Sequence, residues 1–185
     1  MGIKIFFLLN LLGLLSQTSA QAQDIPDDGI AYYVKNMEDG NYQIDAYLST
    51  KAPEIELWKA ITEYEKTPTF VHSVKSSQVK SRDKNVVLVE MNCAGKVLFL
   101  PIKVNLMLNI IEKESEKTLD FVEKSGEDFK MFKGYWRVFN KNEKRVLHFS
   151  VLAKPIHSYF GFTRKVIDYS IQALFVDVQK KVSSI

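Results

Sequence analysis

The side chains that could bind a metal or carry out catalysis are few and widely separated in this sequence. The histidines are His72, His148 and His157, and none lies three or four residues from another histidine or beside a cysteine. Zinc sites use such spacings because several ligands must reach one ion. The sequence also lacks a Gly-x-Ser-x-Gly elbow, a phosphate-binding glycine loop and a dinucleotide fingerprint. It therefore indicates no metal site, and we expect no cofactor.

Cys93 is the only cysteine of the chain. To act as a nucleophile it would need a neighbouring base or cation that lowers the pKa of its thiol. It follows Val87, Val89 and Met91 at alternate positions, so it ends an apolar strand face. This position favours a buried, unreactive thiol. A single cysteine also excludes an internal disulfide, so packing has to stabilise the fold.

Glu123 is the carboxylate with the most suggestive position. It follows Leu119 and Phe121 at alternate positions of a predicted strand, so the three side chains share one face. If that face points inward, Glu123 would orient a polar head group or act as a base, and Tyr64 is a further candidate acid or base. The other interpretation is a carboxylate in water at the end of the strand, where glutamate is most often found.

The first residues are typical of a signal peptide. Lys4 precedes an apolar run over 5–15, and Ala20-Gln21-Ala22 matches a small-x-small cleavage pattern. The run is shorter than the ~20 apolar residues that a transmembrane helix needs. We therefore predict a signal peptide at residues 1–22 and a mature chain that begins at Gln23, with cleavage after Ala20 as the alternative.

The mature chain, residues 23–185, has the length of a single domain. Removal of Lys4 lowers the formal net charge from +3 to +2, because 24 basic residues then face 22 acidic ones. This near-neutral balance gives no electrostatic basis for nucleic-acid binding. We expect an exported protein, either periplasmic or secreted.

Strand and turn residues open the predicted domain. Segments 30–34 and 42–49 are rich in strand formers, and Asp39-Gly40-Asn41 between them is typical of a hairpin turn. A helix is predicted over 53–68, because proline suits the first turn of a helix and a second proline would end it. A second, short helical turn is predicted over 69–72.

The remainder of the chain predicts a sheet followed by one long helix. From Val74 to Pro155 apolar residues recur at every second position between polar turns, most clearly over 104–110. The last segment, 162–182, has an apolar stripe with helical spacing. Short helices after the first strands, a run of antiparallel strands and a long terminal helix make an α+β domain.

This order of elements is the helix-grip arrangement, and several local sequences resemble one family that adopts it. They are Ala52-Pro53 followed by Trp58, the segment 62–71 with Glu63-Tyr64-Glu65 and Pro68, the strand 74–79, and the strand 128–138 with Gly134-Tyr135-Trp136. In these residues the chain resembles the polyketide cyclase/dehydrase and coenzyme Q-binding branch of the START-like (SRPBCC) superfamily.

The resemblance implies a curved antiparallel β-sheet wrapped around a long C-terminal α-helix, with two short helices after the first strands. It also implies a hydrophobic small-molecule ligand, such as a lipid, an isoprenoid quinone or a polyketide-like compound. A signal peptide departs from the usual members of this family, which argues against an intracellular role.

A bent sheet closed by one helix leaves space between the two layers unless large side chains fill it. The residues predicted to form the wall of such a cavity are apolar and point toward the helix. They are Val89, Met91, Leu106, Leu108, Phe121, Phe132, Trp136, Phe149, Ile167, Ile171, Leu174 and Phe175. Glu123 is the candidate polar group of the cavity. The alternative is a solid core made of the same side chains.

Three functional hypotheses follow. The first is a non-enzymatic carrier of a lipophilic molecule, the second a cyclase or hydrolase acting on a lipophilic substrate, and the third a protein-interaction module with a closed core. Tyr159, Phe160 and Phe162 precede the terminal helix and are predicted either to touch a membrane surface or gate the cavity, or to pack as an ordinary loop.

Overall fold

The computed structural model describes residues 25–97, 100–156 and 164–184. Its strands are β1 (Gly29–Asn36), β2 (Tyr42–Thr50), β3 (Val74–Asp83), β4 (Val86–Val97), β5 (Leu100–Lys113), β6 (Thr118–Glu123), β7 (Phe129–Lys141) and β8 (Lys144–Pro155). The helices are α1 (Glu54–Thr62) and α2 (Arg164–Ser183), with short 3-10 helices η1 (Glu38–Gly40), η2 (Tyr64–Thr69) and η3 (Glu114–Glu116). Within the described residues no helix is long and apolar enough to cross a membrane.

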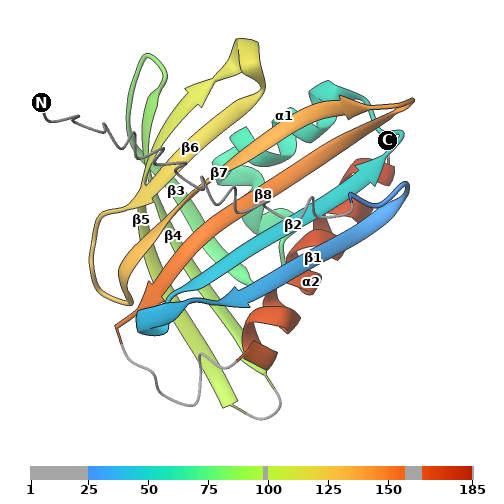
Figure 1. Cartoon of the computed structure of the whole chain (residues 1–185). Coiled ribbons are helices and arrows are strands. Elements are labelled where there is room, and N and C mark those ends of the chain that lie inside the picture. The colour runs from blue at the N-terminus through green and yellow to red at the C-terminus, as the bar shows by residue number, and fades with distance from the viewer. Residues whose placement is uncertain (1–24, 98–99, 157–163, 185) are drawn as a thin grey trace, which may run out of the picture.

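The eight described strands form one antiparallel sheet in the order β1-β2-β8-β7-β6-β5-β4-β3. Neighbours along the chain are neighbours in the sheet, except that β2 pairs with the last strand, β8. Figure 1 shows α1 and α2 on the same side of the sheet, which bends around α2. The predicted α+β class and helix-grip fold are therefore confirmed.

The pairing register separates the two faces of the sheet. Ala46 lies opposite Phe149, Phe149 opposite Trp136, and Trp136 opposite Leu119, so one row of side chains crosses four strands on the face that meets α2. The ring of Phe175 from α2 stacks on Trp136 with 5.7 Å between centroids. The predicted alternation thus places its apolar phase against the helix, where burial stabilises the fold.

Gly134 marks a very close approach of β7 to β8. A Cβ atom added at this position would lie 2.0 Å from the carbonyl oxygen of Ser150. Only glycine fits here, since the atom in the way belongs to the backbone and cannot rotate aside. The residue thus lets the two central strands pack more closely than side chains would allow.

The two short helices that follow β2 differ from the predicted ones. The helix α1 begins at Glu54, directly after Pro53, but it ends at Thr62, whose hydroxyl donates a hydrogen bond of 2.8 Å to the carbonyl of Trp58. The prediction that Pro68 ends this helix is wrong, since Pro68 lies inside η2. The helical turn predicted over 69–72 is also wrong, because η2 already ends at Thr69.

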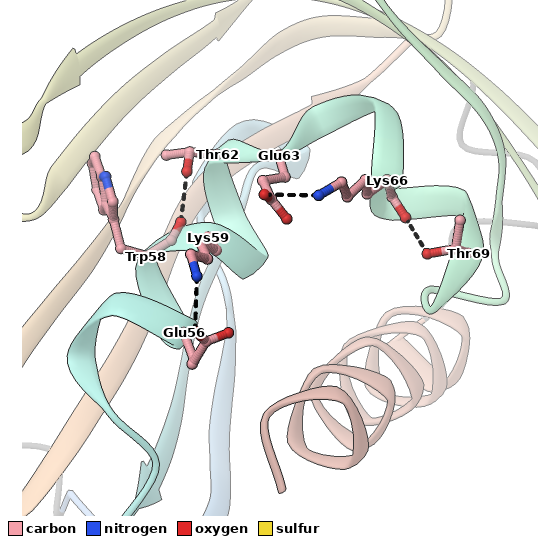
Figure 2. A network of polar contacts seen from close by, with 7 residues as sticks. All are labelled: Glu56, Trp58, Lys59, Thr62, Glu63, Lys66 and Thr69. Carbon is pink, nitrogen blue, oxygen red and sulfur yellow. Dashed lines mark hydrogen bonds and ion pairs between the residues drawn. The ribbon is translucent and has the colours of Figure 1, made fainter. Parts of the chain in front are cut away.

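Local polar contacts stabilise the turns of α1 and η2, as Figure 2 shows. Lys59 pairs with Glu56 at 2.9 Å, and Lys66 pairs with Glu63 at 3.0 Å. Each of these ion pairs joins residues three positions apart, so they support helical turns without fixing the position of the helices on the sheet. That position comes from the buried apolar face of α1.

Two polar contacts tie α2 to the rest of the domain. Near its start, the guanidinium of Arg164 donates a hydrogen bond of 2.6 Å to the carbonyl of Val34 in β1 and also binds Asp168. Near its end, the carboxylate of Asp177 accepts hydrogen bonds of 2.9 Å from the backbone N–H and the ring of His72. These contacts connect the helix to β1 at one end and to the segment between η2 and β3 at the other.

Replacing Gly134 by alanine tests the close approach of β7 and β8. Because the added methyl group meets a backbone oxygen, we expect Gly134→Ala to lower the free energy of unfolding by about 3 kcal/mol. The matched control is Gly95→Ala, whose Cβ would meet no atom within 4 Å and should change stability by less than about 0.5 kcal/mol. Urea unfolding of both variants measures the difference, and equal stability of the two would contradict the interpretation.

Candidate functional site

A cavity with two lobes lies between α2 and the concave face of the sheet. The outer lobe has a volume of about 270 Å³ and includes the exposed residues Gly95, Tyr169 and Ser170 in its lining. The inner lobe has a volume of about 190 Å³, and no described residue that lines it is exposed. The two lobes adjoin along six shared residues: Ser73, Cys93, Leu106, Phe132, Phe149 and Leu174.

The cavity exists because α2 covers only part of the concave face. This helix packs on β1, β2 and α1. Its apolar side chains Ile167, Ile171 and Leu174 therefore face the sheet across open space. Residual space of this kind, lined almost entirely by apolar side chains, is typical of small-molecule sites.

Ten of the twelve predicted wall residues line one or both lobes. Ile167 and Ile171 line the outer lobe; Met91, Leu108, Phe121 and Trp136 line the inner lobe; Leu106, Phe132, Phe149 and Leu174 line both. Val89 and Phe175 line neither lobe, because both are completely buried in the core. Their side chains fill space that the alternation alone assigned to the cavity.

The sequence analysis missed the contribution of α1 and η2 to the site. Ala60, Tyr64 and Phe70 line the inner lobe, whose end they form together with strand residues. Tyr42 and Phe129, at the starts of two strands, were also missed and line the outer lobe. The apolar face of the first helix was a usable signal, but it does not reveal which part of the sheet that face covers.

Glu123 does not line either lobe. Its carboxylate accepts hydrogen bonds from the backbone N–H groups of Ser125 at 2.6 Å and Gly126 at 3.0 Å, and from the hydroxyl of Ser125. Burial alone would raise the pKa of Glu123, but these hydrogen bonds hold the pKa below its usual value. The carboxylate therefore stabilises the turn after β6, and the suggestion that it is a polar group of the cavity is wrong.

Tyr64 lines the inner lobe, and its hydroxyl belongs to a polar network with Glu112 and Arg82. The hydroxyl donates a hydrogen bond of 2.7 Å to Glu112, which also accepts bonds of 2.9 and 3.2 Å from Arg82. Burial raises the pKa of Tyr64 well above 10.0, and the hydrogen bond to Glu112 and its charge raise it further. This tyrosine is therefore held protonated and is poorly suited to act as a base.

Cys93 lines both lobes, close to where they meet. Burial raises the pKa of its thiol to about 11. A thiol with such a pKa carries little thiolate near neutral pH and reacts slowly. The structure thus agrees with an unreactive thiol, in a residue that lines the cavity.

His148 lies on the face of the sheet opposite the cavity and is largely buried. Its side chain is 12% exposed and stacks on Tyr47 at 4.2 Å between ring centroids. Its Nε2 lies 3.1 Å from Asp45, and its Nδ1 lies 3.4 Å from the hydroxyl of Tyr135. Because a carboxylate only accepts, the hydrogen is on Nε2. The network joins β2, β8 and β7 and does not contact the cavity.

Several candidates from the sequence lie outside the described residues. These are the predicted signal peptide 1–22 with its cleavage site, His157, and the aromatic residues Tyr159, Phe160 and Phe162. Among the described residues, no three metal-binding side chains cluster as ligands.

The fold and the cavity define a helix-grip domain with an apolar internal site. The sequence matches the family model "Polyketide cyclase / dehydrase and lipid transport" over residues 50–160, more than half of the chain. The protein therefore belongs to this family. Among functionally curated proteins, none matches the sequence significantly.

Solved structures of the START superfamily share the fold at low sequence identity. The STAR-related lipid transfer protein from Xanthomonas axonopodis has a TM-score of 0.68 and 11% identity, over 86% of this chain and 97% of that one. TTHA0849 from Thermus thermophilus has a TM-score of 0.66 and 15% identity, over 77% and 97%. The Zhui aromatase/cyclase from Streptomyces sp. R1128 has a TM-score of 0.56 and 9% identity, over 78% and 88%. At these identities the likeness shows the fold alone.

Replacing Tyr64 by phenylalanine tests the network at the end of the inner lobe. At pH 7 we expect Tyr64→Phe to lower the free energy of unfolding by about 1.5–3 kcal/mol, the range for a hydrogen bond to a charged group. Above about pH 10 the unfolded chain loses the Tyr64 proton while the folded chain keeps it, so the wild-type protein loses stability as the pH rises. The variant should lack the part of this loss of stability that comes from the Tyr64 hydroxyl.

Urea unfolding at pH 7 and at about pH 11 measures both effects. Tyr169→Phe is the control, because Tyr169 is 57% exposed and has no comparable environment. If Tyr64→Phe and the wild-type protein lose stability equally between the two pH values, the proposed role of the Tyr64 hydroxyl is wrong.

Proposed function

We propose that this protein is an exported binding or carrier protein for a hydrophobic small molecule. The observation that carries the proposal is the two-lobed apolar cavity, with volumes of about 270 and 190 Å³, beneath α2. An apolar ligand gains free energy in proportion to the surface that it removes from water. The family's description as polyketide cyclase, dehydrase and lipid transport proteins supports a lipophilic ligand.

The chemistry of the lining favours binding over catalysis. Among the described residues that line either lobe, the polar groups of the side chains are hydroxyls, one thiol and the indole N–H of Trp136. General acid–base catalysis works best with a group whose pKa lies near the operating pH. Tyr64 and Cys93 both have pKa values raised by burial, which leaves neither poised for proton transfer near neutral pH.

Export is the second part of the proposal, and it rests on the N-terminal sequence. Contacts immediately downstream of the predicted cleavage site are compatible with it. Lys141 donates a hydrogen bond of 2.7 Å to the carbonyl of Ile25, and Ser49 donates one of 2.6 Å to the carbonyl of Pro26. Cleavage before Gln23 would leave both contacts intact. A transient contact of Tyr159, Phe160 and Phe162 with a membrane surface would bring the carrier to its source of ligand.

Alkylation of Cys93 tests occupation of the cavity. Burial raises the pKa of this thiol to about 11, so ligand-free protein should react with N-ethylmaleimide at pH 8 roughly a hundredfold more slowly than an ordinary thiol. Titration with fatty acids, phospholipids and quinones should slow the reaction further, by about tenfold for those that bind, because a bound molecule covers the sulfur. Mass spectrometry of the intact protein measures the rate.

The control places the only cysteine at an exposed site. In the double variant Cys93→Ala/Ser183→Cys the thiol lies at the exposed end of α2, so no compound should change its rate of alkylation. The carrier proposal fails if no compound protects Cys93 and if lipid extraction of protein purified from its own host also recovers no hydrophobic molecule.

Export is tested by the mature N-terminus. Expression of the full sequence in a secreting bacterial host should give protein in the extracytoplasmic fraction, with Gln23 as its first residue by intact mass and N-terminal sequencing. A first residue of Gln21 would indicate the alternative cleavage site. Uncleaved protein confined to the cytoplasm would overturn the export proposal and leave the ligand proposal in place.

A further inference from the structure

We infer that the ligand is a single-chain amphiphile with an uncharged polar end, and that it binds with its apolar tail in the inner lobe. This inference rests on the proposed binding function and adds the class and the orientation of the ligand. It depends on three properties of the cavity: where it meets solvent, how large its inner lobe is, and which groups line it.

The exposed part of the lining indicates where a ligand enters. Gly95 in β4 and Tyr169 and Ser170 in α2 line the outer lobe and are exposed, Tyr169 by 57%. The inner lobe has no exposed residue among its described lining. The polar end of an amphiphile retains most of its hydration when it stays near the exposed end. The tail therefore belongs in the inner lobe.

The size of the inner lobe limits what it can hold. Its volume of about 190 Å³ is close to that of an apolar protein cavity of about 150 Å³ that binds a single benzene. It is lined by large side chains, among them Phe121 and Trp136, which are fixed by packing against Phe149 and Phe132. One chain or one ring fits such a space, whereas two acyl chains side by side do not.

The charges of the lining residues indicate which kind of polar end the ligand has. None of the described residues that line either lobe carries a formal charge. A carboxylate or phosphate drawn into the outer lobe would lose water without gaining a cationic partner, which is strongly unfavourable. The hydroxyl of Ser170 lines the outer lobe and that of Ser73 lies where the two lobes adjoin, and neither has a hydrogen-bond partner among the described residues. These two hydroxyls match a ligand whose polar end is an alcohol, an ester or a ketone.

The inner lobe also contains hydroxyl groups, but they are less suited to a polar end. The hydroxyl of Tyr64 is occupied by Glu112 at 2.7 Å. Thr67 supplies a single hydroxyl from η2, surrounded in the lining by Phe70, Val71 and Val74. Ser73 also lines this lobe and Trp136 adds an indole N–H, but only the outer lobe has exposed polar residues, Tyr169 and Ser170, beside which a polar end keeps contact with water.

The orientation is tested by fluorescence quenching from a nitroxide placed along the chain. In the variant Trp58→Phe the only tryptophan is Trp136, which lines the inner lobe. The probes are the methyl esters of 5-doxyl and 16-doxyl stearate, which differ only in the position of the quencher. We expect the 16-doxyl ester to quench Trp136 at saturation at least about twofold more strongly, because its nitroxide is at the tail end.

The matched control retains the other tryptophan. In Trp136→Phe the remaining Trp58 lines neither lobe and lies beneath the ammonium group of Lys117, so the two esters should quench it equally. Stronger quenching of Trp136 by the 5-doxyl ester would overturn the orientation. Failure of both esters to bind, together with no protection of Cys93 by any compound, would instead overturn the proposed function itself.

The charge of the polar end is tested with two ligands of equal chain length. At pH 8 we expect 1-hexadecanol to bind at least about tenfold more tightly than ionised hexadecanoate, as measured by protection of Cys93 from alkylation. Equal or tighter binding of the carboxylate would overturn the assignment of an uncharged end while leaving the carrier proposal intact.

The role of the inner lobe is tested by filling each lobe separately. Ala60 lines only the inner lobe and Ala173 only the outer lobe. We expect Ala60→Leu to weaken binding of 1-octadecanol at least about tenfold more than binding of 1-decanol, because only the longer chain reaches the inner lobe, whereas Ala173→Leu should weaken both alike. Equal effects of Ala60→Leu on both alcohols would contradict the inference. If that variant does not fold, the quenching experiment remains decisive.

Discussion

The position of α2 is the constraint on which the rest of the structure depends. The helix is fixed at its start by Arg164 bound to the carbonyl of Val34, in its middle by Phe175 stacked on Trp136, and near its end by Asp177 bound to His72. Its backbone lies nearest to β1, β2 and α1. The concave face toward β4 and β5 is then only partly covered and is left as a cavity. The cavity is thus a consequence of where the helix is anchored.

A cavity lowers stability, because the side chains around it lose packing contacts that a filled core would provide. This domain has no disulfide to offset the loss, since Cys93 is its only cysteine. Dense packing elsewhere is the available compensation. Leu48, Leu57, Leu147 and Phe175 are completely buried, and they connect β2, α1, β8 and α2 away from the open space. The core and the cavity therefore occupy different parts of the concave face. Aromatic residues at the boundary, such as Phe149 and Trp136, pack against the core and also line the cavity.

The alternation of apolar residues predicted the sheet, its inward face and most of the wall, because period-two burial is a local property of each strand. This alternation could not distinguish the residues that line the cavity from those that are buried in the core. Val89 has the same phase as Met91, yet only Met91 borders the cavity, because Val89 is completely buried in the core. The prediction for Glu123 was limited in a related way. Its carboxylate accepts a hydrogen bond from the backbone of the turn at Ser125, and the alternation along a strand does not predict the backbone of the turn that follows. The end of α1 at Thr62 likewise is not set by the next proline, since Pro68 lies inside η2.

The two faces of β8 illustrate how the domain keeps a cavity without losing its shape. Phe149 points into the cavity, while its neighbour His148 joins Asp45 on β2 and Tyr135 on β7 across the opposite face. Burial alone would raise the pKa of Asp45, but hydrogen bonds from His148 and other side chains lower the pKa, which indicates that the carboxylate is well satisfied in its charged form. Because these contacts span the three strands that form one wall, they hold the register from outside, where no ligand competes for the space. The strands can then remain fixed on one face while the other face is only partly packed.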